Sequence, residues 1–244
     1  MFLRFTSPAL ALSLCFSLTA PSLAINLVTS RAALSGNDSL NWSSVGTFFP
    51  PSTLPLSFTA TSAGGLGVTV SIPTPPTLPS PPQITNPLIF QTTASGIETN
   101  FAEGDFILFT GLKPGTPPPT LGNPGPLSIA FDSPVKGAGA QIAADDATTS
   151  YTAYIEAFDV NGNSLGIFDI FPATSSLALD NSAVFIGVSS PSAEISRIAF
   201  SSDVALRAIG INTLSINNPA IPEPSGAIAL ILFGSGLIAV KRKR

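Results

Sequence analysis

The chain has 244 residues, of which 44% are hydrophobic and only 10% are charged, against roughly 25% charged residues in an ordinary soluble domain. Between the two ends of the chain, five basic residues face fourteen carboxylates, a formal net charge of −9. Such a charge would repel phosphate backbones and argues against nucleic-acid binding, and the apolar content is too high for a disordered chain.

The first 24 residues have the pattern of a secretory signal peptide. Arg4 supplies the positive start, residues 9–20 are an apolar stretch broken only by small hydroxyl residues, and the run from Ser22 to Ala24 fits a small-x-small cleavage site. We predict a signal helix over residues 1–24 that is removed after Ala24. An N-terminal membrane anchor is the alternative.

Residues 25–126 are predicted to be a proline-rich, partly irregular β region of the exported domain. Ten of the 24 prolines fall within residues 50–87 and six more within 114–126, so these stretches cannot be helix or central strand. Between them, the four apolar residues 106–109 predict a short strand.

Residues 127–218 predict the core of an all-β fold, an antiparallel β-sandwich or jelly roll. Short runs rich in Phe, Ile and Val alternate with turn residues, and Asn161-Gly162 predicts a type I′ hairpin with positive φ at both central positions. We expect Phe131, Ile155 or Phe158, Phe185 and Phe200 inside. Strands are predicted over residues 127–131, 138–143, 151–158, 164–171, 183–188, 194–200 and 209–216.

Residues 219–244 contain three parts in a fixed order. Pro222, Glu223 and Pro224 come first, the sixteen-residue apolar run 225–240 follows, and Lys241, Arg242, Lys243 and Arg244 end the chain. The prolines keep the triplet extended, the run is just below the usual spanning length of about 17–25 residues, and the basic end is held on the cytoplasmic side. We predict a transmembrane helix over 225–240.

This tail resembles the PEP-CTERM sorting signal of bacterial exported proteins. The resemblance covers about 24 residues and rests on the Pro-Glu-Pro triplet, the Gly-containing apolar run and the basic end together. It implies that a membrane-embedded exosortase processes the tail, and it implies an association with exopolysaccharide. An ordinary single-pass tail anchor is the alternative.

The body resembles the β-sandwich domain common among such exported proteins. The similar segments are residues 131–135, 158–163, 185–188 and 209–214. Where such domains often have Asp after the Gly-Ile step, this chain has Asn212, so a metal role is not carried over to this position.

Several routes to catalysis are closed because the sequence has no histidine, and its single cysteine, Cys15, lies in the predicted signal peptide. This excludes Ser-His-Asp and Cys-His nucleophiles and the usual zinc ligand sets. We expect no catalytic site, metal or cofactor.

Three weaker candidate sites are carried by polar or aromatic residues. Glu98, Glu103 and Asp105 could include a glycosidase pair or be solvated loop charges, and Asp145-Asp146 fits a turn. The oxygens of Asp159, Asn161 and Asn163 could bind calcium or belong to a plain hairpin turn. The rings of Trp42, Tyr151 and Tyr154 could stack on sugars or lie in the core.

The sequence therefore leaves three hypotheses. The first is a non-catalytic cell-surface or matrix protein, exported, anchored in the envelope membrane until its tail is processed, and associated with exopolysaccharide. The second is a carbohydrate-binding β-sandwich module, and the third is a secreted carboxylate-dependent glycoside hydrolase. An exposed aromatic platform would favour the second, and two facing carboxylates in a cleft would favour the third.

Overall fold

The computed structural model describes residues 24–46, 52–74, 84–94, 98–112, 121–145 and 150–219. The predicted signal helix before Ala24, the Pro222-Glu223-Pro224 triplet, the predicted membrane helix 225–240 and the basic end 241–244 therefore lie outside the described residues. Within the described ranges, no helix is long and apolar enough to cross a membrane.

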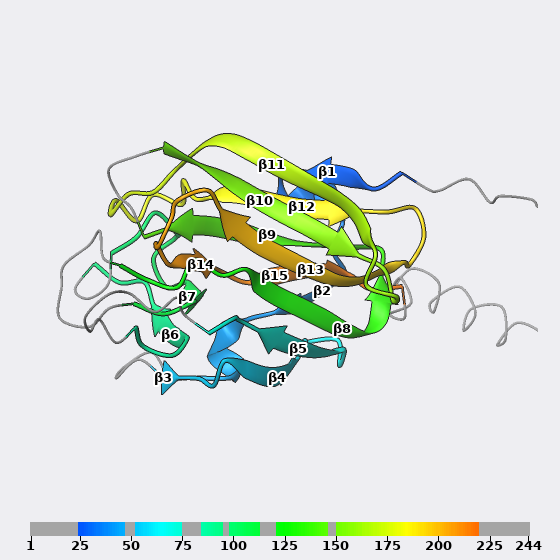
Figure 1. Ribbon diagram of the computed structural model, residues 1–244, viewed down its shortest axis with the longest axis horizontal. Coiled ribbons are helices and arrows are strands. Elements are labelled where there is room, and N and C mark those ends of the chain that lie inside the picture. The colour runs from blue at the N-terminus through cyan, green and yellow to red at the C-terminus, as the bar shows by residue number, and fades with distance from the viewer. Residues whose placement is uncertain are drawn as a thin grey trace, which may run out of the picture.

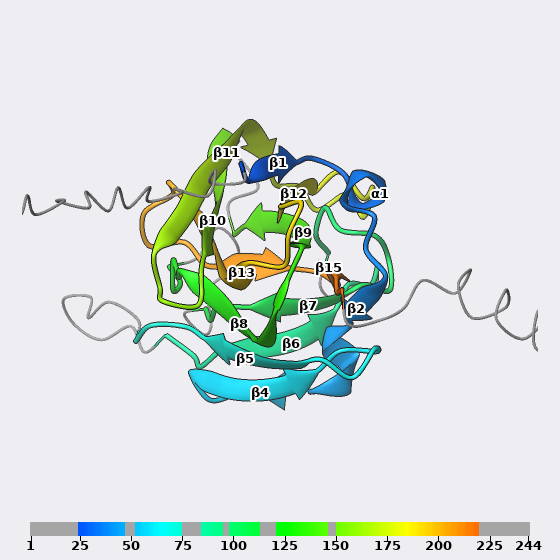
Figure 2. The same cartoon turned by 90° about the vertical axis from the view of Figure 1, so that its right-hand side faces the viewer.

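The fold is all-β and consists of two sheets in which every described strand pairing is antiparallel (Figure 1). Sheet B has the order β11-β10-β13-β8-β5-β4, and in the end-on view of Figure 2 it runs from β11 at the top left to β4 at the bottom. Its strands are β4 (Ser57–Thr61), β5 (Gly67–Ser71), β8 (Leu127–Val135), β10 (Ser150–Phe158), β11 (Ser164–Thr174) and β13 (Ile195–Ser202).

Sheet A has nine strands, and its main path has the order β1-β12-β9-β14-β7-β6-β3, while β15 pairs with both β9 and β2. A short helix, α1 (Arg31–Leu34), and a 3₁₀ turn, η1 (Trp42–Ser44), flank β2. The strands of sheet A are β1 (Asn26–Val28), β2 (Asp38–Leu40), β3 (Ser52–Thr53), β6 (Leu88–Gln91), β7 (Phe106–Phe109), β9 (Gly137–Ala144), β12 (Val184–Ser189), β14 (Ile209–Ile211) and β15 (Leu214–Asn217).

The main core lies between the two sheets and draws apolar side chains from both. Period-two alternation produces it: along β10, Tyr151, Ala153, Ile155 and Ala157 are buried while the residues between them are half-buried. The predictions that Phe131, Ile155 and Phe200 lie inside are confirmed. We call this two-sheet body the sandwich.

Of the two alternatives predicted for the core, Ile155 is the buried one, whereas Phe158 lies on the outer face of sheet B together with Tyr154. They alternate with the buried residues of β10, and each is half-buried. The guanidinium carbon of Arg197, on the neighbouring strand β13, lies 3.4 Å from the centroid of the Phe158 ring. This cation–π contact covers the ring on the solvent side.

The hairpin predicted at Asn161-Gly162 is present, but its turn is not type I′. Gly162, with φ 81°, is the one residue of this turn with positive φ. The Asp159 N–H donates to the Asn163 oxygen (3.0 Å) and the Gly162 N–H to the Asp159 oxygen (3.1 Å). The loop is thus longer than two residues, which removes the need for positive φ at Asn161.

The strand predicted over residues 209–216 is two strands, β14 and β15, separated by Asn212 and Thr213. Both halves pair with the same edge of β9. Beyond that edge they diverge, because β14 pairs with β7 while β15 pairs with β2. Sheet A therefore forks at Asn212.

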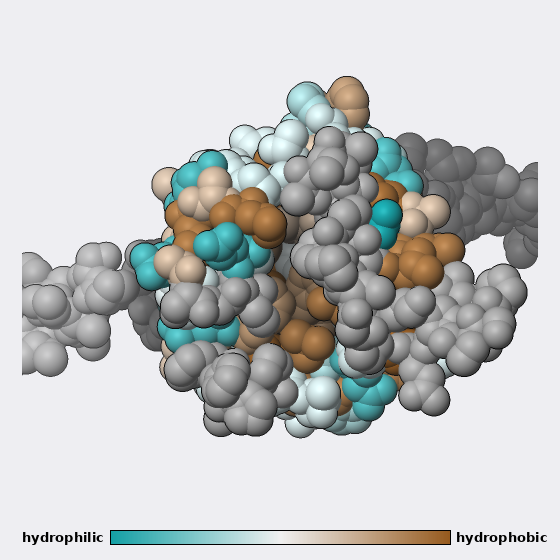
Figure 3. Space-filling model, turned by 90° about the vertical axis from the view of Figure 1, so that its left-hand side faces the viewer, coloured by the Kyte–Doolittle hydropathy of each residue, from teal (hydrophilic) through white to brown (hydrophobic). Residues whose placement is uncertain are grey.

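The proline-rich half of the chain contributes strands to both sheets. Residues 25–126 supply β1, β2, β3, β6 and β7 to sheet A and β4 and β5 to sheet B. The strand predicted over residues 106–109 is β7. The end of the sandwich near β3, β6 and β7, seen in Figure 3, shows apolar surface bordered by hydrophilic residues.

Two glycines let an aromatic ring lie flat on the outer face of sheet A. Gly139 of β9 and Gly187 of β12 are cross-strand partners, and Phe185 covers both. A Cβ on Gly139 would lie 2.6 Å from the Gly187 Cα and 2.9 Å from the Phe185 Cζ. Phe185 is buried as predicted, but in a cluster with Val28 and Leu34 outside the main core.

We expect the Gly139→Ala variant to lose about 1–3 kcal/mol of unfolding free energy, because the added methyl group overpacks this site. Urea unfolding of the purified protein followed by circular dichroism would measure the loss. Ser57→Ala, at an exposed position of the edge strand β4, is the control and should stay within about 0.5 kcal/mol of wild type. Equal stability of the two variants would contradict the packing account.

Candidate functional site

At the fork in sheet A, some backbone N–H and carbonyl groups have no partner on a neighbouring strand, and side chains form hydrogen bonds with them instead. The indole Nε1–H of Trp42 donates to the Asn212 carbonyl oxygen (2.8 Å), and Nη1 of Arg31 donates to the Thr213 carbonyl oxygen (2.9 Å). The Gln141 N–H donates to the side-chain oxygen of Asn212 (3.1 Å). An unpaired buried backbone group is costly, so these contacts make the fork possible.

The buried side-chain amide of Asn212 is the centre of a polar cluster. Its nitrogen donates to Oδ2 of Asp105 (3.0 Å) and to Oε1 of Gln141 (2.6 Å). Its oxygen accepts from Gln141 N and from Nη2 of Arg31 (3.1 Å). An aspartate could accept but not donate, so this environment selects asparagine.

Arg31 reaches the cluster from the start of α1. The side chain of Ser30 caps this helix by accepting from the Ala33 N–H (3.2 Å). The guanidinium carbon lies 5.3 Å from the centroid of Phe185, and Nη1 also donates to the Ser215 hydroxyl. Burial lowers the pKa of Arg31, and the negative charge of Asp105 acts in the opposite direction.

A hollow of ≈ 400 Å³ opens over this cluster, and a second hollow of ≈ 530 Å³ shares three of its lining residues, Arg31, Ser39 and Ser215. Asp105, Gln141, Asn181 and Asn212 contribute to the smaller hollow. Asp38 and Gly64 contribute to the larger one. Figure 2 shows α1, β2 and β15 on the same side of the molecule. We call the two hollows together the polar groove.

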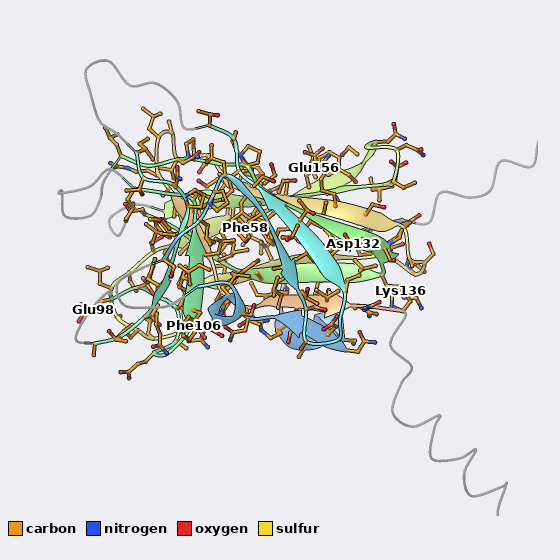
Figure 4. The ribbon with its side chains drawn as sticks, turned by 90° about the horizontal axis from the view of Figure 1, so that it is seen from below. Phe58, Glu98, Phe106, Asp132, Lys136 and Glu156 are labelled. Atoms are coloured by element: carbon orange, nitrogen blue, oxygen red, sulfur yellow. The ribbon has the colours of Figure 1, made fainter. Side chains whose placement is uncertain are left out.

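Of the three carboxylates proposed as a glycosidase pair, Asp105 alone lines the groove. Glu98 and Glu103 are exposed, and Figure 4 shows Glu98 at the periphery of the molecule. The other carboxylate in the groove, Asp38, accepts from the Ser62 hydroxyl at Oδ2 (2.6 Å) and from the Gly64 N–H at Oδ1 (2.7 Å). Of the two carboxylates that line the groove within the described residues, Asp38 therefore uses both oxygens in the fold, and Asp105 uses one.

Two of the three aromatic residues proposed for sugar stacking are core residues. Trp42 is fully buried, and Tyr151 is buried with its hydroxyl donating to the Ile142 oxygen (3.0 Å). Burial raises the pKa of Tyr151 well above its ordinary value. Tyr154 remains on the outer face of sheet B, and it does not reach the groove.

The Asp159 loop uses its carboxylate within its own turn. Oδ1 accepts from the N–H groups of Asn161 (2.9 Å) and Asn163 (2.8 Å), and Oδ2 accepts from the Asn163 amide (2.9 Å). The bond from the Asn163 side chain is the main cause of a lowered pKa for Asp159. Among the described residues, no group of three or more metal-ligating side chains is gathered. Asp145 follows β9, and Asp146 lies outside the described residues.

Sequence reasoning missed Arg31, Gln141 and Asn181 as site residues. They lie in three distant segments, and their amide and guanidinium groups carry no motif. Gln141 is the one polar residue in the otherwise small and apolar β9, and it is the only half-buried one there. A single polar residue in a strand of small apolar residues indicates that its side chain has a specific polar partner, and this pattern is visible in the sequence.

No protein-family model matches the chain, and no curated protein matches it.

We expect Asn212→Asp to destabilise the protein by about 2–3 kcal/mol at neutral pH, because it removes two donors and adds a negative charge beside Asp105. Urea unfolding measured between about pH 7 and pH 4 is the test. Protonating one carboxyl group relieves the repulsion, so the folded variant binds a proton more readily than its unfolded chain. The difference in unfolding free energy between wild type and the variant should therefore become smaller as the pH falls.

Asn41→Asp is the matched control, since the exposed Asn41 side chain accepts from Ser43 N (2.9 Å) and an aspartate can do the same. A deficit of Asn212→Asp that stays constant with pH, or that is no larger than in the control, would contradict the donor role of Asn212.

Proposed function

We propose that this chain is an exported, non-catalytic cell-surface or matrix protein that is sorted through its C-terminal tail and associated with exopolysaccharide. In this proposal residues 1–24 are a removed signal helix, and residues 225–240 are a transmembrane helix. An exosortase-type enzyme is the partner that processes the tail, and the protein stays in the envelope membrane until then. The observation that carries the proposal is the position of the two ends of the fold.

One row of residues across sheet A brings the two ends together. Asn26 of β1 is paired with Ser189, Ser189 with Gly137, and Gly137 with Asn217 of β15. Figure 1 accordingly shows both ends of the described chain at the right-hand side of the molecule. A signal helix before Asn26 and a tail after Asn217 can therefore enter one membrane while the sandwich folds on its outer side.

The chain length between the sandwich and the tail supports a position close to the membrane. Residues 218–221 separate Asn217 from Pro222, and four residues span at most about 14 Å. The end of the sandwich that carries Asn217 also carries Lys136, whose N–H donates to the Asn217 oxygen (2.9 Å). Figure 4 shows Lys136 at the opposite end from Glu98. This end would face the membrane.

The jelly-roll description of the sandwich is part of the same proposal. From β8 to β10 and again from β11 to β14, successive strands alternate between the two sheets. Such alternation is what two interleaved Greek keys require.

We expect intact mass spectrometry of the exported protein to give a chain that begins at Ile25 and lacks residues 241–244. Cleavage after Ala24 leaves β1 complete, since that strand starts at Asn26. Retention of the basic end on the mature protein would instead support a simple membrane anchor.

Glu223→Ala should block processing while leaving membrane insertion intact. Insertion depends on the apolar run and the basic end, whereas a protein receptor can recognise the carboxylate held between two prolines. Cell fractionation and immunoblotting should show the variant accumulating as a membrane-bound, unprocessed species. Glu98→Ala, an exposed glutamate outside the tail, is the control and should be processed like wild type. Normal processing of Glu223→Ala would refute sorting.

A further inference from the structure

We propose that the polar groove binds a segment of a neutral glycan chain. This inference rests on the proposed association with exopolysaccharide and names the surface that makes it. The hollows of ≈ 400 and ≈ 530 Å³ are each within the usual size of ligand pockets, about 300–1,000 Å³. Because Arg31, Ser39 and Ser215 line both hollows, the two are neighbours, and in this proposal successive sugars of a linear chain occupy one and then the other.

The groups that line the groove offer both donors and acceptors. Oδ1 of Asp105 has no hydrogen-bond partner among the described residues and can accept from a ligand hydroxyl. The exposed Asn181 accepts at its Oδ1 from Nε2 of Gln141 (2.9 Å), which leaves its amide nitrogen able to donate. Sugar hydroxyls donate and accept at once, so a mixed lining of this kind suits them.

The charges in the groove favour a neutral ligand. The Arg31 guanidinium donates to the oxygen of the Asn212 amide and the Asp105 carboxylate accepts from its nitrogen, so opposite charges lie on the two sides of one buried side chain. A phosphate or a uronate would meet the carboxylates of Asp105 in the smaller hollow and Asp38 in the larger one, and a cation would meet Arg31, which lines both. A neutral polyol avoids both repulsions, and its hydroxyls can accept a charge-assisted hydrogen bond from Arg31 and donate one to Asp105.

The groove is held in place before any ligand binds. Asn212 ties Arg31, Asp105 and Gln141 together through hydrogen bonds. The guanidinium carbon of Arg31 also lies 5.3 Å from the centroid of Phe185, which is buried in a cluster with Val28 and Leu34. A site with few side-chain rotamers to order loses little free energy in binding. Weak individual contacts to hydroxyls can therefore add up.

The test uses the full-length chain on an array that carries neutral oligosaccharides and uronic-acid oligosaccharides. Isothermal titration calorimetry with the neutral tetrasaccharide that binds best then compares variants. Asp105→Asn should weaken binding about tenfold, since it removes a charged acceptor and keeps the side-chain shape. Asn181→Gly should also weaken it several-fold, and glycine accepts the positive φ of 58° at this position.

Asp169→Asn is the matched control, with the same charge change at an exposed position of β11, and it should bind like wild type. The inference is overturned if no neutral oligosaccharide binds, if uronates or inorganic phosphate compete more strongly than neutral chains, or if the three variants bind equally. Thermal melts verify that each variant is folded. Asp105→Asn should be processed normally in cells, so a loss of glycan binding is distinguishable from a failure of sorting.

Discussion

The fork of sheet A at Asn212 is the constraint on which the polar surface of this protein depends. Two short strands share one edge of β9 and then diverge to different partners. The backbone groups at the break are satisfied by Trp42, Arg31 and the Asn212 side chain itself. Because Arg31 comes from α1 and Trp42 from η1, the fork also ties the N-terminal segment to the last strands of the fold.

The same constraint explains why polar groups collect on an otherwise apolar sheet. Gln141 and Asp105 complete the hydrogen bonds of the Asn212 amide, and both also line the smaller hollow. One cluster can therefore both stabilise the fork and contribute to the groove. The side chains of Asp105 and Gln141 each use one oxygen to hold Asn212, and both residues also line the smaller hollow. The glycines of β9 and β12 contribute by letting Phe185 lie flat beneath Arg31.

Much of the fold could be predicted because strand signals are local. Alternating apolar residues and turn residues located nearly every strand from residue 127 onward, and the apolar run 106–109 became β7. Local pattern also left choices open, for a physical reason. The period of a strand does not say which face is buried, so only the packing decided between Ile155, which lies in the core, and Phe158, which lies against Arg197. Residues 209–216 have the composition of a single strand. They form two strands because the first part pairs with β7 and the second part pairs with β2.

The sequence by itself determined the all-β class, the absence of histidine and the order of apolar and basic segments at the two ends, because composition and local pattern are properties of the chain alone. The tertiary structure decided what depends on contacts between distant segments. It brought Arg31, Asp105, Gln141 and Asn212 into one groove and placed Asn26 in the same row as Asn217. Neither result has a local signal, since pairing partners and register are fixed only when the strands assemble around a common core.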